Sequence, residues 1–206
     1  TLRVEGLPED EARSVEVGLI DPETRRSVLF SDRFPVSGNV RLQRRNVAAT
    51  RTLEVPPGRY EVMLEGRPEL YLAGISARGA EARGRMVTLP AGESGLTLHV
   101  TSGRATLSGV ANFEGKPSVG AMVLLVPATL GDPGAIAVLR RDQSNTDGSF
   151  DLPEVIPGQY ILVAIDHGWG INWSDASTLR RYLTQGVPLD LTAGANVKQN
   201  VAAQAP

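Results

Sequence analysis

Apolar and polar positions alternate along most of the chain and predict many short β-strands. The clearest stretch, TDGSFDLPEVIPGQYILVAI at 146–165, contains two turn signals. The Asp-Gly dipeptide at 147–148 suits a tight hairpin turn, and the Pro-Gly dipeptide at 157–158 suits a second turn. Phe150 and Leu152 alternate with polar residues between the turns. From Tyr160 to Ile165 the chain is apolar at every position, which indicates a strand covered on both faces.

The segment LEVPPGRYEVML at 53–64 repeats this pattern. It places a proline, a glycine and a tyrosine about one hundred residues before their counterparts at 157–160. A valine ending the preceding strand and an alternating strand afterwards recur as well. An internal repeat at this scale predicts two tandem β-domains, which we place at 1–102 and 103–206.

The outward positions of the two repeated strands differ in character. Glu61, Met63 and Glu65 in the first strand become Ile161, Val163 and Ile165 in the second. One face of the first strand is therefore expected to be exposed to solvent. Apolar side chains left in water would forgo about 1.5–3 kcal/mol of burial each, so the second strand needs a cover. Asp175 followed by apolar residues at helical spacing in 176–183 predicts a short helix on that face, with the first domain as the alternative cover.

Further strands are expected wherever alternation recurs. In the first half they lie at 2–4, 15–19, 28–30, 50–55, 60–64, 70–75, 85–89 and 96–100. In the second half they lie at 107–110, 120–127, 136–139, 149–152, 160–165, 187–191 and 197–201. A turn is expected at Ser37-Gly38-Asn39, before Val40 and Leu42. The last residues, 202–206, are expected to fray.

The second half also resembles a known family. Residues 107–110 (LSGV), 115–117 (GKP), 120–127 (GAMVLLVP) and 145–164 follow the order and spacing of the carboxypeptidase regulatory-like domain. The resemblance implies a transthyretin-like (prealbumin-like) β-sandwich with a carbohydrate-binding-like fold. More narrowly, the half is similar to the version found in large surface and outer-membrane proteins of acidobacteria, whose tryptophan-rich loop the segment 166–175 matches. We therefore expect an all-β fold of two tandem Greek-key β-sandwich domains, with one short helix in the second.

Composition supports this class and excludes others. Among 206 residues there are 22 Gly and 14 Pro with only 5% aromatic residues, as expected for short strands joined by turns. The net charge of −2 and the scattered arginine pairs do not predict a nucleic-acid partner. The chain has no cysteine and no apolar run of membrane-spanning length. Because it begins at Thr1 without a methionine, we expect a fragment or a processed mature chain.

The aromatic loop at 166–183 is the predicted ligand-binding site. Trp169 and Trp173 are the two tryptophans of the chain, and Tyr182 and Asp175 lie close to them in the sequence. Exposed indole rings beside carboxyl and amide groups can stack on sugars and bond their hydroxyls. The alternative is that these residues pin the loop onto the apolar strand as a satellite core.

Catalytic, metal and cofactor sites are not expected. His99 and His167 have no sequence neighbours spaced like metal ligands or a nucleophile's base. Oxygen-bearing residues at 142, 145, 147 and 151 could hold calcium, but their spacing departs from the calcium-loop pattern and suits hairpin turns. The peptidase that gives the family its name carries its zinc ligands in a separate domain, so the resemblance implies no peptidase activity.

The first functional hypothesis is a non-catalytic accessory or interaction module of a larger exported or cell-surface bacterial protein. Its expected partners are other domains of the same parent protein or another surface protein, without membrane insertion of this segment. We expect a periplasmic, outer-membrane-associated or extracellular location. The alternative is a carbohydrate-binding module that uses the 166–183 loop, and an enzyme ranks third.

Overall fold

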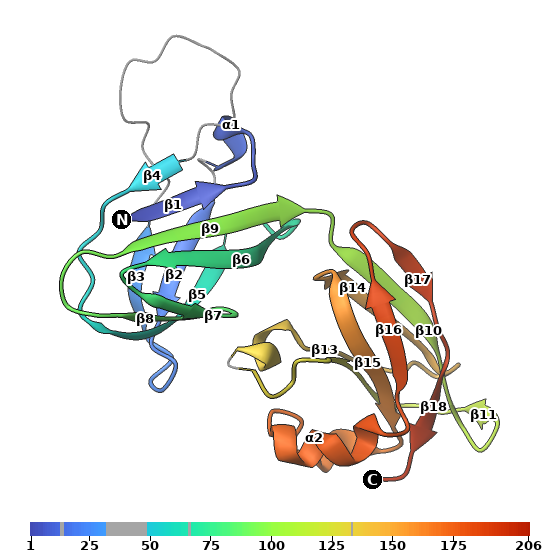
Figure 1. The fold of residues 1–206 in the computed structure, drawn as a ribbon. Helices are drawn as coiled ribbons and strands as arrows, with labels where there is room; N and C mark the ends of the chain where they lie inside the picture. The colour runs from blue at the N-terminus through green and yellow to red at the C-terminus, as the bar shows by residue number, and fades with distance from the viewer. Residues whose placement is uncertain (13–14, 32–48, 66, 133) are drawn as a thin grey trace. The chain divides into compact units, whose positions relative to one another are not determined.

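A computed structural model divides the chain into two compact units, Thr1–Ser102 and Gly103–Pro206 (Figure 1). The structure describes residues 1–12, 15–31, 49–65, 67–132 and 134–206. The predicted all-β fold with a short helix in the second half is confirmed. An additional helical turn, α1 (Glu9–Ala12), lies between the first two predicted strands of the first half. Within the described ranges, no helix is both long and apolar enough to cross a membrane.

The first unit is a sandwich of two sheets. Its strands are β1 (Leu2–Glu5), β2 (Glu16–Ile20), β3 (Ser27–Ser31), β4 (Ala49–Arg51), β5 (Gly58–Glu65), β6 (Leu70–Arg78), β7 (Glu81–Arg83), β8 (Met86–Leu89) and β9 (Gly95–Ser102). One sheet has the order β4-β1-β9-β6, with β1 and β9 parallel. The other, β3-β2-β5-β8-β7, is antiparallel throughout. Aliphatic side chains of both sheets, among them Val4, Val62 and Leu98, fill the space between them.

The strands of the second unit also form two layers, which its last strand joins into one nine-stranded sheet. Its strands are β10 (Ala105–Phe113), β11 (Lys116–Pro117), β12 (Met122–Pro127), β13 (Arg140–Gln143), β14 (Ser149–Val155), β15 (Gly158–Ile165), β16 (Val187–Leu191), β17 (Asn196–Lys198) and β18 (Val201–Gln204). The strands β13-β12-β15-β16 form one antiparallel layer. In the other, β10 pairs with β14 on one side and with β17, in parallel, on the other. Strand β18 pairs with both β10 and β15.

The pairing partners of the central strand correspond between the units. In the first unit β5 lies between β2 and β8, and in the second β15 lies between β12 and β16. The repeated tyrosine makes the same bond in both. The Tyr60 hydroxyl donates to the Pro56 carbonyl (2.8 Å), and the Tyr160 hydroxyl donates to the Ile156 carbonyl (2.6 Å). The repeat seen in the sequence therefore fixes a repeated corner before each central strand.

The outer face of β15 carries the third layer that its apolar sequence requires. Val163 and Ile165 are buried, with 1% and 0% exposure, and join a cluster that also contains Leu179 and Tyr182 of helix α2 (Ala176–Leu183). The prediction of a helix packed on this face is confirmed, and the helix comes from the second unit itself. Gly168 permits the close approach, because a Cβ there would lie 2.8 Å from Ile165 Cβ.

The outer face of β5, which corresponds to that of β15, is less exposed to solvent than its sequence indicates. Glu61 is 4% exposed, although an alternating strand predicted a solvated side chain. Its carboxylate accepts a hydrogen bond from Arg25 Nη1 (2.5 Å), and this ion pair allows the charge to be buried. Met63 and Glu65, further along the strand, are half-buried.

Three local predictions are wrong, each for a physical reason. Residues 136–139 form a 3₁₀ turn, η1 (Ala135–Val138), whose apolar side chains cover the outer face of the second unit while the polar segment after it supplies β13. Residues 52–55 lie outside β4, ahead of two prolines that cannot donate to a ladder. Residues 202–204, expected to fray with the last two, instead belong to β18, which pairs with β10 and β15. The turn expected at 37–39, with Val40 and Leu42, falls outside the described residues.

Candidate functional site

The loop between β15 and β16 contains the four residues predicted to bind a ligand. It runs from Asp166 to Gly186 and contains a 3₁₀ turn, η2 (Gly168–Gly170), followed by helix α2. Helix α2 ends beside strand β18, where Gln204 Nε2 donates to the Tyr182 carbonyl (2.9 Å). The loop is thus fixed at its helical end by the framework of the second unit.

The Asp175 side chain caps the N-terminus of this helix. One carboxylate oxygen accepts from Ser177 N (3.1 Å), and the other accepts from Ser177 Oγ (2.5 Å), Thr178 N (3.2 Å) and Thr178 Oγ1 (2.7 Å). These bonds favour the ionised form, so the Ser177 and Thr178 side chains lower the pKa of Asp175 from 3.8 to about 2. Both oxygens are therefore engaged in the cap of α2.

Tyr182 and Trp173 belong to the covering layer. Tyr182 is only 3% exposed, and the Arg181 guanidinium lies 4.5 Å from the centre of its ring. Trp173 is half-buried beside the same cluster, and the Arg141 guanidinium lies 4.7 Å from its ring centre. Each ring contributes packing and a cation–π contact, which matches the satellite-core alternative for these two residues.

Trp169 is different, because it remains on the surface. It is 45% exposed, and its indole Nε1 donates to the Gly120 carbonyl at 2.8 Å. Val119, which precedes that glycine, is 55% exposed. These two are the large apolar side chains found exposed among the described residues, and the indole bond joins Trp169 to the residue that follows Val119. We call this pair the Trp169–Val119 patch.

Polar groups border the patch. The Asp166 carboxylate accepts from Ser118 Oγ (2.6 Å) through one oxygen and contacts His167 Nδ1 (2.7 Å) through the other. The bond from Ser118, with a smaller contribution from His167, lowers the pKa of Asp166. Ser118 is buried and bonded to the aspartate rather than to the imidazole, so the three groups do not form a nucleophile and base. The arrangement orients an exposed imidazole whose Nε2 is directed away from its carboxylate partner.

His99 has contacts that sequence reasoning missed. Its Nε2 lies 2.7 Å from Ser76 Oγ, and its Nδ1 lies 3.8 Å from Glu5 Oε2. The Glu5 carboxylate also pairs with Arg3 Nε at 2.9 Å. The 3.8 Å separation exceeds a hydrogen bond, and these side chains lie on the exposed outer face of the β1-β9-β6 sheet. The network is therefore cross-strand pairing on a surface. Outward positions on three adjacent strands were its only sequence signal.

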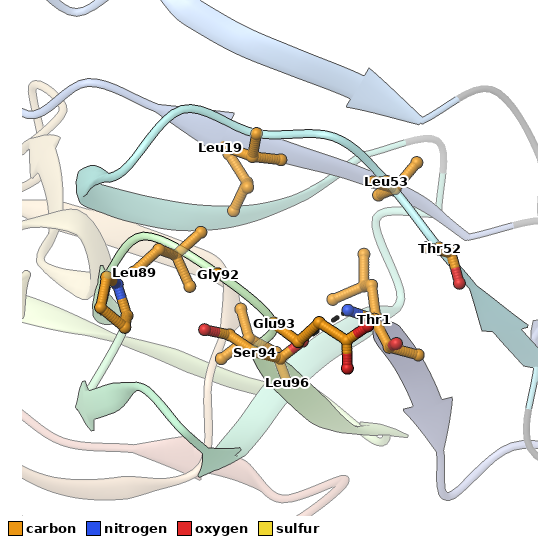
Figure 2. Close-up of a pocket in the computed structure, with 12 residues that line it drawn as sticks. Thr1, Leu19, Thr52, Leu53, Leu89, Gly92, Glu93, Ser94 and Leu96 are labelled. Carbon is orange, nitrogen blue, oxygen red and sulfur yellow. Dashed lines mark hydrogen bonds between the residues drawn. The ribbon is translucent and has the colours of Figure 1, made fainter.

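A cavity of about 280 Å³ lies at one end of the first unit (Figure 2). Both sheets contribute aliphatic side chains to its wall, as does the segment that precedes β5. The apolar wall consists of Leu2, Leu19, Leu53, Val55, Leu89, Pro90 and Leu96. Thr1, Thr52, Glu93 and Ser94 add polar groups, and the Thr1 ammonium donates to the Ser94 carbonyl (2.5 Å). No sequence pattern predicted this cavity, because each residue that lines it is of a type expected in the core or in a turn.

The calcium alternative has no support in these contacts. Asp142 accepts from Gln143 N (2.8 Å) and Asp151 N (2.8 Å), and Asp147 accepts from Ser149 N (3.0 Å). The bonds from Ser149 lower the pKa of Asp147. These carboxylates stabilise the hairpin between β13 and β14. Among the described residues, there is no group of three or more His, Cys, Asp or Glu residues placed to share a metal ion.

No protein-family model matches the chain, and no curated protein matches it significantly. Among solved structures, the minor pilin GBS52 of Streptococcus agalactiae is 10% identical over 98% of this chain and 94% of its own, with a TM-score of 0.35. The major pilin BcpA of Bacillus cereus is 6% identical over 98% of each chain, with a TM-score of 0.33. A candidate carbohydrate-binding protein of Pseudomonas aeruginosa is 14% identical over 48% of this chain and 88% of its own, with a TM-score of 0.33. Matches at this level carry no argument about the ligands or partners of this chain.

Proposed function

We propose that the chain is a non-catalytic accessory and interaction module of a larger exported or cell-surface bacterial protein. The observation that carries the proposal is the Trp169–Val119 patch, where two large apolar side chains are half-exposed and the indole of Trp169 donates to the carbonyl of Gly120, the residue after Val119. The resemblance of the second half to carboxypeptidase regulatory-like domains supports the same class. We place the protein in the periplasm, at the outer membrane or outside the cell.

The patch suits contact with a polypeptide surface. An exposed indole fixed by its own N–H presents a rigid ring with little entropy to lose on binding, and tryptophan is enriched among residues that dominate interfaces. Exposed Val119 extends the apolar area, while Asp166 and His167 provide a polar border. The proposed partner is another domain of the same parent protein or a second surface protein.

Site-specific photo-crosslinking tests this proposal. A benzophenone amino acid is placed at position 119 of the complete parent protein in its natural host, and crosslinked peptides are identified by mass spectrometry. We expect position 119 to crosslink to one defined surface of a second domain or protein. The matched control is position 159, because Gln159 is exposed on the same unit but lies on the opposite strand end of β15 from the patch. Equal crosslinking from both positions would contradict the proposal.

Carbohydrate is the second candidate ligand, and the exposed Trp169 ring favours it. An indole face beside the Asp166–His167 pair can stack on a sugar while the imidazole bonds a hydroxyl. In this arrangement Trp173, Tyr182 and Asp175 hold the loop in place behind Trp169. A glycan array with the native chain and Trp169→Ala tests it, with Gln159→Ala as the control. Binding that survives Trp169→Ala would exclude this candidate.

A further inference from the structure

The outer face of the β4-β1-β9-β6 sheet (Figure 1) carries a polar hollow of about 370 Å³. One row of side chains crosses the four strands in register, in the order Thr50, Arg3, Thr97 and Ser76. Their neighbours along β1 and β9 are buried in the core, so alternation along each strand directs the row outward. Arg78, two residues beyond Ser76 on β6, also lines the hollow. We call the space lined by these five residues the outer hollow.

Arg78 lies across a glycine at the edge of the outer hollow. It pairs with Gly95 on β9, and a Cβ on that glycine would be 3.9 Å from both Cβ and Nε of Arg78. The arginine side chain therefore folds over the position where Gly95 has no side chain, close to the face of the sheet. Because Arg78 is exposed, its guanidinium remains accessible to a ligand.

Arg78 supplies the unbalanced positive charge of the outer hollow. Of the described residues that line the hollow, none is acidic. At its borders the charges are offset. Glu5 Oε1 contacts Arg3 Nε (2.9 Å), and Thr1, which lines both spaces, shares the end cavity of Figure 2 with the Glu93 carboxylate. Arg78 has no ion pair within the described ranges, so the hollow favours an anionic ligand.

Hydroxyl groups accompany the guanidinium groups in the outer hollow. In the described part of the chain, the Thr50 and Thr97 side chains have no hydrogen-bond partner, whereas Ser76 Oγ lies 2.7 Å from His99 Nε2. A hydroxyl both donates and accepts, as the hydroxyls of a sugar do, whereas a carboxylate only accepts. A guanidinium binds a planar carboxylate through two parallel bonds. The outer hollow thus presents groups for both parts of a carboxylated sugar.

From these observations we infer that the outer hollow binds a carboxylated sugar, such as a uronic acid unit of a polysaccharide. Its carboxylate meets the Arg78 guanidinium, and its hydroxyl groups meet Thr97 and Thr50. A volume of about 370 Å³ lies within the range of known ligand pockets, about 300–1,000 Å³. The site belongs to the first unit, so the inference is independent of the Trp169–Val119 patch and of the proposed function.

An NMR titration of the native chain with three matched compounds tests the inference, at about 0.15 M salt to screen non-specific attraction. Trigalacturonate carries carboxylates and ring hydroxyls, its methyl ester keeps the rings without the charge, and triglutamate keeps carboxylates without sugar hydroxyls. We expect trigalacturonate to shift the amide signals of Ser76, Arg78 and Thr97 and to bind at least about tenfold more tightly than either control compound. No shifts at these residues, or equal binding of the ester or the peptide, would overturn the inference.

Matched variants show which groups the sugar contacts. Arg78→Gln removes the guanidinium, and Arg59→Gln removes an exposed arginine from β5, in the other sheet of the same unit. Thr97→Val removes a hydroxyl at nearly constant shape, and Thr101→Val does so on the same strand outside the hollow. We expect Arg78→Gln to weaken trigalacturonate binding by about tenfold or more, Thr97→Val by about threefold or more, and each control variant by less than about twofold. Equal losses from a variant and its control would contradict the site.

Discussion

The two units share a strand framework and differ in what covers it. In the first, the segment between β5 and β8 forms β6 and β7 and extends the sheets. In the second, the segment between β15 and β16 forms η2 and α2 and packs as a third layer on the outer face. An insertion at the same topological position therefore widens one sandwich and thickens the other. The unit that is thickened is the one whose central strand is apolar on its outer face.

The largest expected loss of stability comes from placing a polar residue of the kind found on the outer face of β5 at the corresponding position of β15. Ile165→Glu places a carboxylate at a position that is 0% exposed under helix α2, and we expect it to destabilise the second unit by about 3–5 kcal/mol. The reciprocal change, Glu65→Ile, concerns a half-buried position and is expected to alter the first unit by less than about 1 kcal/mol. Urea denaturation followed by NMR signals of each unit measures both. Equal effects would show that the two faces are covered alike.

The next largest loss of stability concerns the Arg25–Glu61 ion pair on the outer face of β5. Arg25→Ala leaves the buried Glu61 carboxylate without its partner. Because the Arg25 side chain is itself 60% exposed, solvent reduces the penalty to about 1–2 kcal/mol of unfolding free energy. Arg26→Ala, an exposed neighbour, serves as the control in the same denaturation experiment. A loss no larger than in the control would mean that the Glu61 charge is solvated.

The repeated tyrosine tests what the units have in common. Tyr60→Phe and Tyr160→Phe each remove one hydroxyl-to-carbonyl bond, and we expect each to destabilise its own unit by about 0.5–1.5 kcal/mol. Markedly unequal losses would show that the two corners are not equivalent.

Tyr160 adds a pH-dependent signature to this pair. Burial raises its pKa above 10, against smaller opposing effects of Arg140 and Arg104. Above pH 10 the unfolded chain ionises first, so the native second unit loses stability as the pH rises. Tyr160→Phe lacks this loss, and the stability difference between native chain and variant should shrink in alkaline denaturation curves. A difference that stays constant above pH 10 would contradict the raised pKa.

The smallest expected effect comes from the helix cap. Asp175→Ala removes the acceptor for the first amides of α2, and we expect the unfolding temperature of the second unit to fall by roughly a few degrees near neutral pH. Since the folded pKa is lowered to about 2, this stabilisation is present above pH 3.8 and disappears as the pH falls towards 2. Thermal unfolding of native chain and variant at pH 6 and pH 2 measures the difference. A gap that does not narrow at pH 2 would contradict it.

Periodicity was sufficient to predict most of the framework. The paired turns before Tyr60 and Tyr160 placed the central strands, and the change from Glu61 to Ile161 predicted the covering helix, because burial of a strand face must be matched by another element. The segment 136–139 misled for the same reason. Its apolar residues cover the outer face as a 3₁₀ turn, and alternation alone does not distinguish a strand from a covering turn.

The candidate sites were less predictable than the fold. The four residues expected at the ligand site share a loop, but whether a ring faces solvent depends on contacts made far away in the sequence. Trp169 is exposed and its N–H donates to the Gly120 carbonyl, whereas Tyr182 packs in the cluster on the apolar outer face of β15. In the sequence, Val119 is a single apolar residue between residues typical of turns, and this pattern did not mark it as part of a site. The end cavity depends on where β4 stops, which residues 52–55 did not reveal.

Fluorescence of single-tryptophan proteins tests most directly whether the loop divides into a covering part and a contact part. Trp173→Phe leaves Trp169 as the only emitter, and Trp169→Phe leaves Trp173. We expect the Trp169 protein to emit at longer wavelength and to be quenched more strongly by acrylamide than the Trp173 protein, whose ring lies beside Arg141 in the covering layer. Equal quenching, or stronger quenching of Trp173, would contradict the assignment of Trp169 to the contact surface.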